Sequence, residues 1–195
     1  MKLRLILSAV MVVALSGCGL LGGKTPPSLM TLQSAAMVQA QTNRSAATGD
    51  TITVIAPAMV QEINTNRVPV RSGGVAVAYV QDARWVDTPD TLFRELLSET
   101  IAARTGRVVL SDAQRTLDPG ARLTGQLLAF SVDADRNEVV VTYDAALLRA
   151  QGTRVETRRS EARVPVAAIE RAAVAAAMNQ AANQVAADIA AWIGN

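Results

Sequence analysis

The feature that most constrains the fold is a run at the start of the chain that ends in the only cysteine. Two basic residues lie within Met1 to Arg4, an almost continuous apolar run follows from Leu5 to Leu15, and then comes Ser16-Gly17-Cys18. This order is typical of a lipoprotein signal peptide, which is cleaved before the cysteine. The run is also shorter than the about 20 residues of a spanning helix. We therefore expect residues 1–17 to be removed and Cys18 to carry a diacylglycerol and an acyl chain.

The amino-acid composition limits which catalytic and metal sites the mature chain can have. The sequence has one cysteine and no histidine, so acylation of Cys18 would leave no thiol for a disulfide or a metal site. Without histidine, Ser-His-Asp and Cys-His catalysis and histidine-ligated zinc are excluded. The formal net charge of +2 equals the contribution of Lys2 and Arg4, and no basic patch with aromatic neighbours points to nucleic acid. We expect no enzyme activity, no metal and no cofactor apart from the covalent lipid.

The chain after the cysteine indicates one domain on a tether. Residues 18–28 contain Gly-Gly and Pro-Pro pairs and are expected to form a lipidated flexible tether. Residues 29–195 are long enough for a single α+β domain with its own core. Within it, Leu29 to Leu32 is expected to be a short strand. Residues 33–50 are rich in Ala, Gln, Thr and Ser and are expected to be a mobile loop.

Hydrophobic periodicity predicts strands, one helix, a meander and a closing helix. Strands are expected at residues 51–57, 75–80, 107–110, 121–132, 138–149 and 153–165, and residues 61–71 are expected to be a polar connection. An alanine-rich helix is expected at residues 166–193, with one stripe of Val174, Met178, Ala181, Val185, Ile189 and Trp192 facing the sheet. The predicted fold class is α+β: a two-layer sandwich of a mainly antiparallel sheet with two helices packed on one face.

The first helix has clear start and stop signals. Thr88 is a good N-cap residue, Pro89 suits the first helical position, and Asp90 suits the first turn. Gly106 is expected to end the helix in the left-handed conformation. We predict that the Thr88 side chain caps the helix.

The strand at residues 153–165 has charged residues at both odd and even positions, so both of its faces are expected to be polar. A strand of this kind is expected at an edge of the sheet. Together with the loop at residues 133–138, it is a hypothetical contact edge for a partner or a second copy. Because glutamates interleave with the arginines, a merely solvated edge is the alternative. The acidic loop lacks the glycine and glutamate spacing of a calcium loop. The arginines that would make the contact are Arg154, Arg158, Arg159 and Arg163.

Four short sequence segments resemble segments of one known protein family. They are Ile52-Thr-Val-Ile-Ala-Pro57, Ile63-Asn-Thr-Asn-Arg67, Val77-Ala-Tyr79 and Ala83-Arg-Trp85-Val-Asp-Thr-Pro89. In this order, with the lipidation motif, the chain resembles the ABC-type transport auxiliary lipoproteins, which include the paraquat-inducible protein C group. The resemblance marks Arg67, Tyr79, Trp85 and Pro89 as signature residues. Tyr79 and Trp85 are expected to pack in the core, with an interaction surface as the alternative.

The resemblance also implies a function. Family members are non-catalytic, lipid-anchored subunits of envelope ABC systems that contain MCE-domain proteins and move lipids between the inner and outer membranes. It thus implies an MCE-domain protein with its ABC permease and ATPase as partners, the membrane through the anchor, and a possible homo-oligomer. Gly19, where an Asp would retain a lipoprotein at the inner membrane, leads us to expect the outer membrane, facing the periplasm. The alternatives are a lipid- or small-molecule-binding carrier and an assembly factor of another outer-membrane complex.

Overall fold

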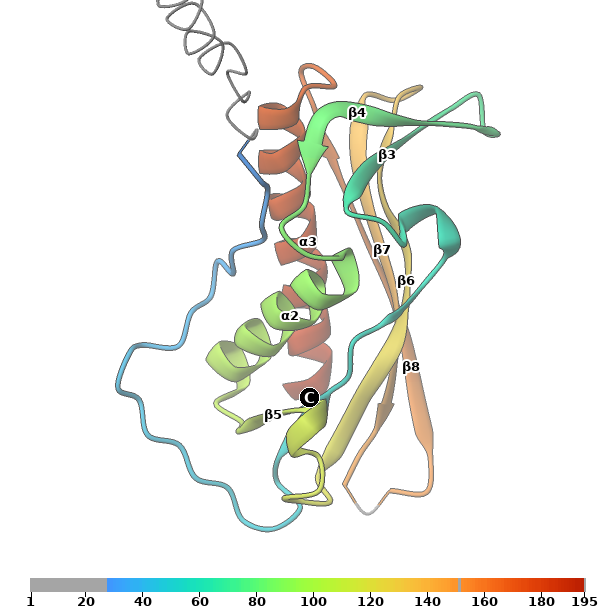
Figure 1. Ribbon diagram of the computed structural model, residues 1–195. Helices are drawn as coiled ribbons and strands as arrows, with labels where there is room; N and C mark the ends of the chain where they lie inside the picture. The colour runs from blue at the N-terminus through green and yellow to red at the C-terminus, as the bar shows by residue number, and fades with distance from the viewer. Residues whose placement is uncertain (1–27, 151, 195) are drawn as a thin grey trace, which may run out of the picture.

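The computed structural model describes residues 28–150 and 152–194. Within them, one sheet of eight strands is covered on one face by two helices, α2 (Pro89–Thr105) and α3 (Arg171–Gly194) (Figure 1). The signal peptide and Cys18 lie outside the described residues. The strands are β1 (Ile52–Val54), β2 (Ala58–Met59), β3 (Arg67–Ser72), β4 (Ala76–Arg84), β5 (Val109–Ser111), β6 (Ala121–Asp133), β7 (Glu138–Leu148) and β8 (Val155–Pro165).

The long strands β6, β7 and β8 form the predicted antiparallel meander. Arg122 pairs with Leu148 at one end of the β6–β7 ladder, and Asp133 pairs with Glu138 at the turn. The β7–β8 ladder is regular along its whole length. These strands lie where they were predicted because each is long and is bounded by turn residues. They form one half of the sheet.

On its other side β6 is bordered by parallel neighbours, and this corrects the predicted sandwich. β1 runs parallel to both β5 and β6, and β2 and β3 also run parallel to β6. The sheet is therefore mixed and curls into a half-barrel, while the α+β class holds. The helix α2 separates β1 from β5 in sequence, and a strand–helix–strand order of this kind permits a parallel pair. Strands of two or three residues are too short for alternation to reveal their direction.

The core lies between the helices and the sheet. The apolar face of α2 is buried. The predicted stripe of α3 is buried too, except for Trp192, which is only partly buried, and Ile193 lies in the core instead. Aromatic rings fill the middle of the layer: Trp85 lies 5.3 Å from Phe130, and Phe93 lies 5.2 Å from Tyr143, measured between ring centroids. Burial raises the pKa of the Tyr143 phenol well above its usual range, and its hydroxyl donates to the Thr124 carbonyl.

Four local predictions need correction. The expected connection at residues 61–71 contains strand β3, and the closing helix begins at Arg171, five residues later than expected. The expected strand at Leu29 to Leu32 is a single bridge between Met30 and Trp85. The fourth correction concerns the cap of α2. The helix begins at Pro89 as predicted, but the Thr88 side chain makes no capping hydrogen bond, so its expected contribution is absent.

Residues 33–50 contain no helix or strand, as expected, yet the segment is tied to both helices. The backbone amide of Gln33 donates to Asn179 of α3, and that of Val38 donates to Glu99 of α2. The Arg44 guanidinium donates to the Ala102 carbonyl at 2.6 Å. These bonds fix the segment along the helical layer. None of the described helices is long and apolar enough to cross a membrane.

Candidate interaction surface

Strand β8 has two different faces, which corrects the expectation that both are polar. Ser160, Ala162 and Val164 are buried, and β8 packs against α3 through this inner face. Their neighbours Arg159, Glu161 and Arg163 are exposed on the outer face of the sheet. Within the described residues β8 pairs only with β7, so its other side is a free edge as predicted. The strand is therefore structural on one face and open to a partner on the other.

The outer face carries a cross-strand ion pair between Arg159 and Asp144. These residues are register partners on β8 and β7. The Arg159 Nε and Nη2 atoms donate to the two Asp144 carboxylate oxygens, each at 2.5 Å. The hydrogen bond from Arg159 holds the pKa of Asp144 below its usual range, so the pair stays charged at neutral pH. A bidentate arginine of this kind is held in a fixed orientation.

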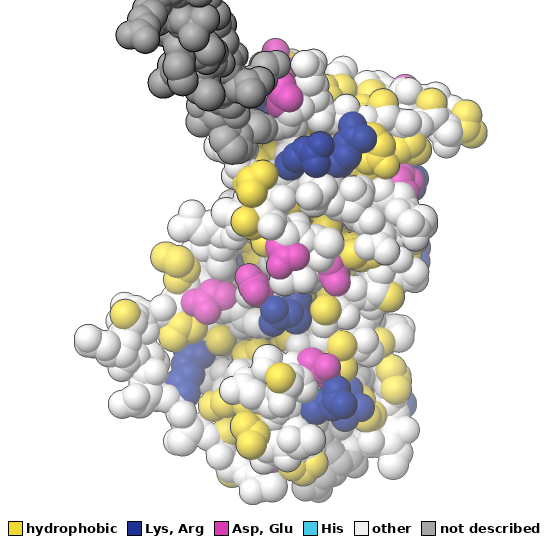
Figure 2. Space-filling model, in the orientation of Figure 1, with side chains coloured by type: hydrophobic (Ala, Val, Ile, Leu, Met, Phe, Trp, Pro, Cys, Tyr) yellow, Lys and Arg dark blue, Asp and Glu magenta, His cyan; other side chains and the backbone are white. Residues whose placement is uncertain are grey.

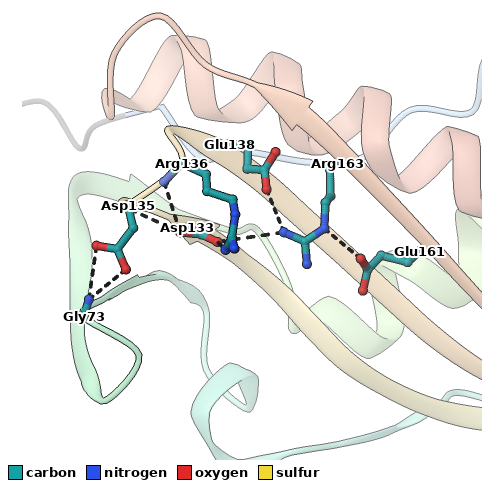
Figure 3. Close-up of polar contacts among 7 residues, drawn as sticks. All are labelled: Gly73, Asp133, Asp135, Arg136, Glu138, Glu161 and Arg163. Atoms are coloured by element: carbon teal, nitrogen blue, oxygen red, sulfur yellow. Dashed lines mark hydrogen bonds and ion pairs between the residues drawn. The ribbon is translucent and has the colours of Figure 1, made fainter.

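Further along β8, Arg163 lies in a cluster of charges that includes the β6–β7 turn. Figure 3 shows its guanidinium between carboxylates, donating to Glu138 at 2.6 Å and to Glu161 at 2.7 Å. Asp133 lies 3.8 Å from Arg163 and forms its own pair with Arg136 at 2.9 Å. We call this set, Asp133, Arg136, Glu138, Glu161 and Arg163, the arginine–carboxylate cluster. Its hydrogen bonds lower the pKa of Glu161 and of Asp133.

The cluster borders a hollow of about 340 Å³ on the outer face of the sheet. Its floor comes from β6 and β7, where Ser131, Val140 and Thr142 are buried, and Arg71 of β3 lies at its margin. Asp135 of the β6–β7 turn accepts from the backbone amide of Gly73 at 2.9 Å, which joins that turn to the β3–β4 turn. Among the described residues no group of three acidic side chains is placed to hold a metal ion. The arrangement suits recognition of polar, charged groups on another molecule.

Two of the arginines that the sequence placed at the contact edge have other positions. Arg158 points to the helical layer, where its Nη2 and Nε atoms donate to Asp188 of α3 at 2.5 Å and 3.0 Å. It therefore ties β8 to α3. Arg154 is exposed in the segment just before β8. The structure thus brings together Arg159 and Arg163, with the loop at residues 133–138, and separates Arg158 from them.

The four signature residues are near one another in the chain but differ in environment. Trp85 is 1% exposed and packs on Phe130, and Pro89 is buried at the start of α2, so the core expectation for Trp85 is confirmed. Tyr79 is 37% exposed, so the core expectation for Tyr79 is wrong. The Arg67 guanidinium lies 3.9 Å from the centre of the Tyr79 ring. This pair marks the base of the β3–β4 hairpin.

Sequence reasoning missed the partners of the arginines and the exposure of one apolar segment. Asp144 and Asp188 are 15 and 30 residues away from Arg159 and Arg158, and no local pattern joins them. The apolar segment follows Gly73 and Gly74, which take φ angles of 56° and 73° at the tip of the β3–β4 hairpin. Its signal was available: residues 72–80 contain no charge although they flank a tight turn.

Comparisons with known proteins agree on a family and a fold. The family model described as "ABC-type transport auxiliary lipoprotein component" matches residues 31–190. A crystal structure of a Xanthomonas campestris protein of the DUF330 family model superposes with a TM-score of 0.62 at 19% identity, covering 86% of this chain and 92% of that one. An uncharacterised protein of known structure gives 0.65 at 15% identity, covering 85% and 99%. Among curated proteins, none matches the sequence.

Proposed function

Since the chain belongs to the ABC-type transport auxiliary lipoprotein family, we propose that it is a non-catalytic, lipid-anchored periplasmic subunit of an ABC/MCE-type system that moves lipids between the inner and outer membranes. The family match over residues 31–190 carries this proposal. The outer face of β8 adds a surface on which another subunit can dock. In this proposal the protein acts by positioning other components, and the chemistry of transport belongs to them.

The anchor in this proposal is Cys18, with its diacylglycerol and acyl chain, held at the outer membrane. Its test is a Cys18→Ser variant of the full chain, grown with a palmitate analogue and then fractionated. We expect the wild type to be labelled and to sediment with the outer membrane, and the variant to be uncleaved and unlabelled. A labelled Ser variant would reject Cys18 as the acceptor, and wild type in the inner membrane would reject the proposed location.

The docking surface in this proposal is the outer face of β8 with the arginine–carboxylate cluster. A strand with a free edge can accept a strand or a charged segment from another chain. The ion pairs of Arg159 and Arg163 hold their guanidinium groups in place, so docking would order few additional side chains. Charges on such an edge also disfavour random pairing. The proposed partner is the MCE-domain protein.

The test is co-purification of the full-length lipoprotein with the MCE-domain protein from detergent-solubilised envelopes. Arg159→Glu should lower the recovered partner roughly tenfold, because it places a carboxylate beside Asp144 and inverts the charge offered to the partner. Arg115→Glu is the matched control, since Arg115 also forms an exposed ion pair, with Asp112 at 2.8 Å, far from β8 in the chain. Equal recovery with all three proteins would reject this face as the docking surface.

A lipid carrier is a weaker reading of the same fold. A carrier would need a deep apolar cavity between sheet and helices, and in this protein that layer is occupied by the buried rings of Trp85, Phe93, Phe130 and Tyr143. The hollow beside Arg163 is lined largely by polar and charged side chains and does not suit acyl chains. If the co-purified protein is instead another outer-membrane complex, the assembly-factor alternative replaces the transport role.

A further inference from the structure

The β3–β4 hairpin exposes an apolar surface that the proposed docking role does not use. Its tip is the Gly73-Gly74 turn, and residues 72–80 carry no charge. Val75 is 94% exposed, and Val77 and Tyr79 are also exposed. Figure 2 shows hydrophobic side chains at this projecting end of the molecule, next to basic ones. An uncharged, apolar edge of this kind is usually covered in a working protein.

The hairpin projects at the same end of the molecule where the described chain begins (Figure 1). There the backbone of Met30 bonds to Arg84 and Val86, on either side of Trp85, just beyond the base of the hairpin. The tether from Gly19 to Ser28 spans at most roughly 35 Å when fully extended. A lipid on Cys18 would therefore keep this end of the body within that distance of the membrane surface, near enough for the hairpin to reach it.

The base of the hairpin has the chemistry of a membrane interface. The Arg67 guanidinium stacks over the Tyr79 ring at 3.9 Å, and Arg84 lies opposite Arg67 in the ladder. Aromatic side chains with a polar end are enriched at the headgroup level of membranes, and basic side chains there can reach phosphates. The apolar tip and this polar base thus match the two layers of a bilayer surface.

We propose that the tip of the β3–β4 hairpin, Gly74 to Val77, enters the surface of the bilayer that holds the Cys18 lipid, with Tyr79 and Arg67 at the headgroups. This rests on the lipid anchor of the proposed function. In the described part of the chain β4 pairs only with β3. The insertion is therefore shallow, because hydrocarbon would not satisfy the backbone groups on the other edge of β4. The hairpin then fixes which way the body faces. Gly73 is bonded to Asp135 of the β6–β7 turn, so that end of β8 lies next to the membrane surface, while the part of its outer face around Arg159 stays free for a protein partner.

The test uses the mature lipoprotein in vesicles of phosphatidylethanolamine and phosphatidylglycerol, with an environment-sensitive fluorophore on an introduced thiol. Lipidated Cys18 is a thioether and does not react, so Val75→Cys supplies the only reactive thiol. Leu117→Cys is the matched control, because Leu117 is an exposed apolar residue in the loop between β5 and β6. In Figure 1 this loop lies at the end of the molecule opposite the hairpin. Wild type should remain unlabelled; labelled wild type would instead show that the Cys18 anchor has failed.

We expect the probe at position 75 to shift to shorter emission wavelengths with vesicles and to be quenched several-fold more by nitroxide-labelled acyl chains than the probe at position 117. Equal, water-like signals at both positions in an anchored protein would overturn the proposal while leaving the anchor intact. A probe at position 75 that becomes shielded only when the partner protein is added would also overturn it, since the hairpin would then be covered by protein.

Discussion

The two long outer strands of the sheet, β4 and β8, differ in the side chains that they expose to solvent. β8 buries small side chains against α3 and carries ion pairs on its exposed face, where Arg159 is bound to Asp144. β4 exposes every residue from Ala76 to Tyr79 and carries no charge there. Charged side chains allow an edge strand to stay in water without pairing with strands of other molecules. An uncharged, apolar edge strand is usually covered by another surface. This difference supports the two proposals made above, a protein partner at β8 and a membrane surface at β4.

The largest expected effect comes from one substitution made on each strand. Ala162→Asp would bury a carboxylate between β8 and α3, because Ala162 is 8% exposed, and should lower the free energy of unfolding by about 3 kcal/mol or more. Ala78→Asp on exposed β4 should cost less than about 1 kcal/mol. Urea denaturation measures both, and a similar loss in the two variants would break the distinction between the strands.

A charge swap separates docking from folding. Arg159→Asp combined with Asp144→Arg keeps a cross-strand ion pair but exchanges its two ends, so stability should stay near that of wild type. Binding to the partner should still fall, by about 1.4 kcal/mol or tenfold. Isothermal calorimetry or surface plasmon resonance gives the affinity. Wild-type affinity in the swapped protein would mean that the sign of the charge on β8 is irrelevant to docking.

The inner ion pair of β8 predicts a modest pH dependence of stability. The hydrogen bond from Arg158 lowers the pKa of Asp188. Because the folded-state pKa is the lower one, this contribution is present above the unfolded value of about 3.9 and is lost as pH falls through the folded-state value. The contribution should be small, since both side chains are partly exposed and solvent screens the pair.

Asp188→Asn is the corresponding variant. Thermal unfolding at neutral pH should show a lower Tm for the variant than for wild type. The gap should begin to narrow below about pH 4 and close as pH falls through the folded-state pKa of Asp188. A gap that is constant with pH would mean that the Arg158 pair contributes nothing through charge.

The smallest expected effect is at the base of the hairpin. Arg67→Ala removes the guanidinium from the Tyr79 ring and should lower the free energy of unfolding by about 0.5 kcal/mol, the value typical of an exposed cation–π contact. Arg67→Lys should recover part of it. Neither variant should change affinity at β8, and a change there would show that the two edges are coupled.

Sequence signals were reliable where they were local. The start of α2 at Pro89 and its left-handed end at Gly106 were predicted, as was the β6–β7 hairpin, because turn and helix-end residues act over a few positions. Strand β3 was missed because Pro69 and two arginines mask its alternation. The direction of β1 could not be read from three residues, because it depends on which strands lie beside it.

The candidate site was predicted in outline. The free edge of β8 followed from its charges, but Arg158 belongs to the helical layer because Asp188 lies on α3, and no sequence spacing indicates that. The spacing of Ser160, Ala162 and Val164 at every second position was a signal for a buried face. Exposure of Tyr79 depends on how far the hairpin projects from the sheet, which is a property of the whole fold.

Photocrosslinking in cells can identify the neighbour of each edge of the sheet. A photoreactive amino acid is placed at position 159 on β8, at 75 on the hairpin and at 117 as the control, each in the full-length lipoprotein with its transport system present. We expect a protein adduct from position 159, a lipid adduct from position 75 and neither from position 117. A protein adduct from position 75 together with none from position 159 would show that β4, and not β8, is the edge that meets a protein.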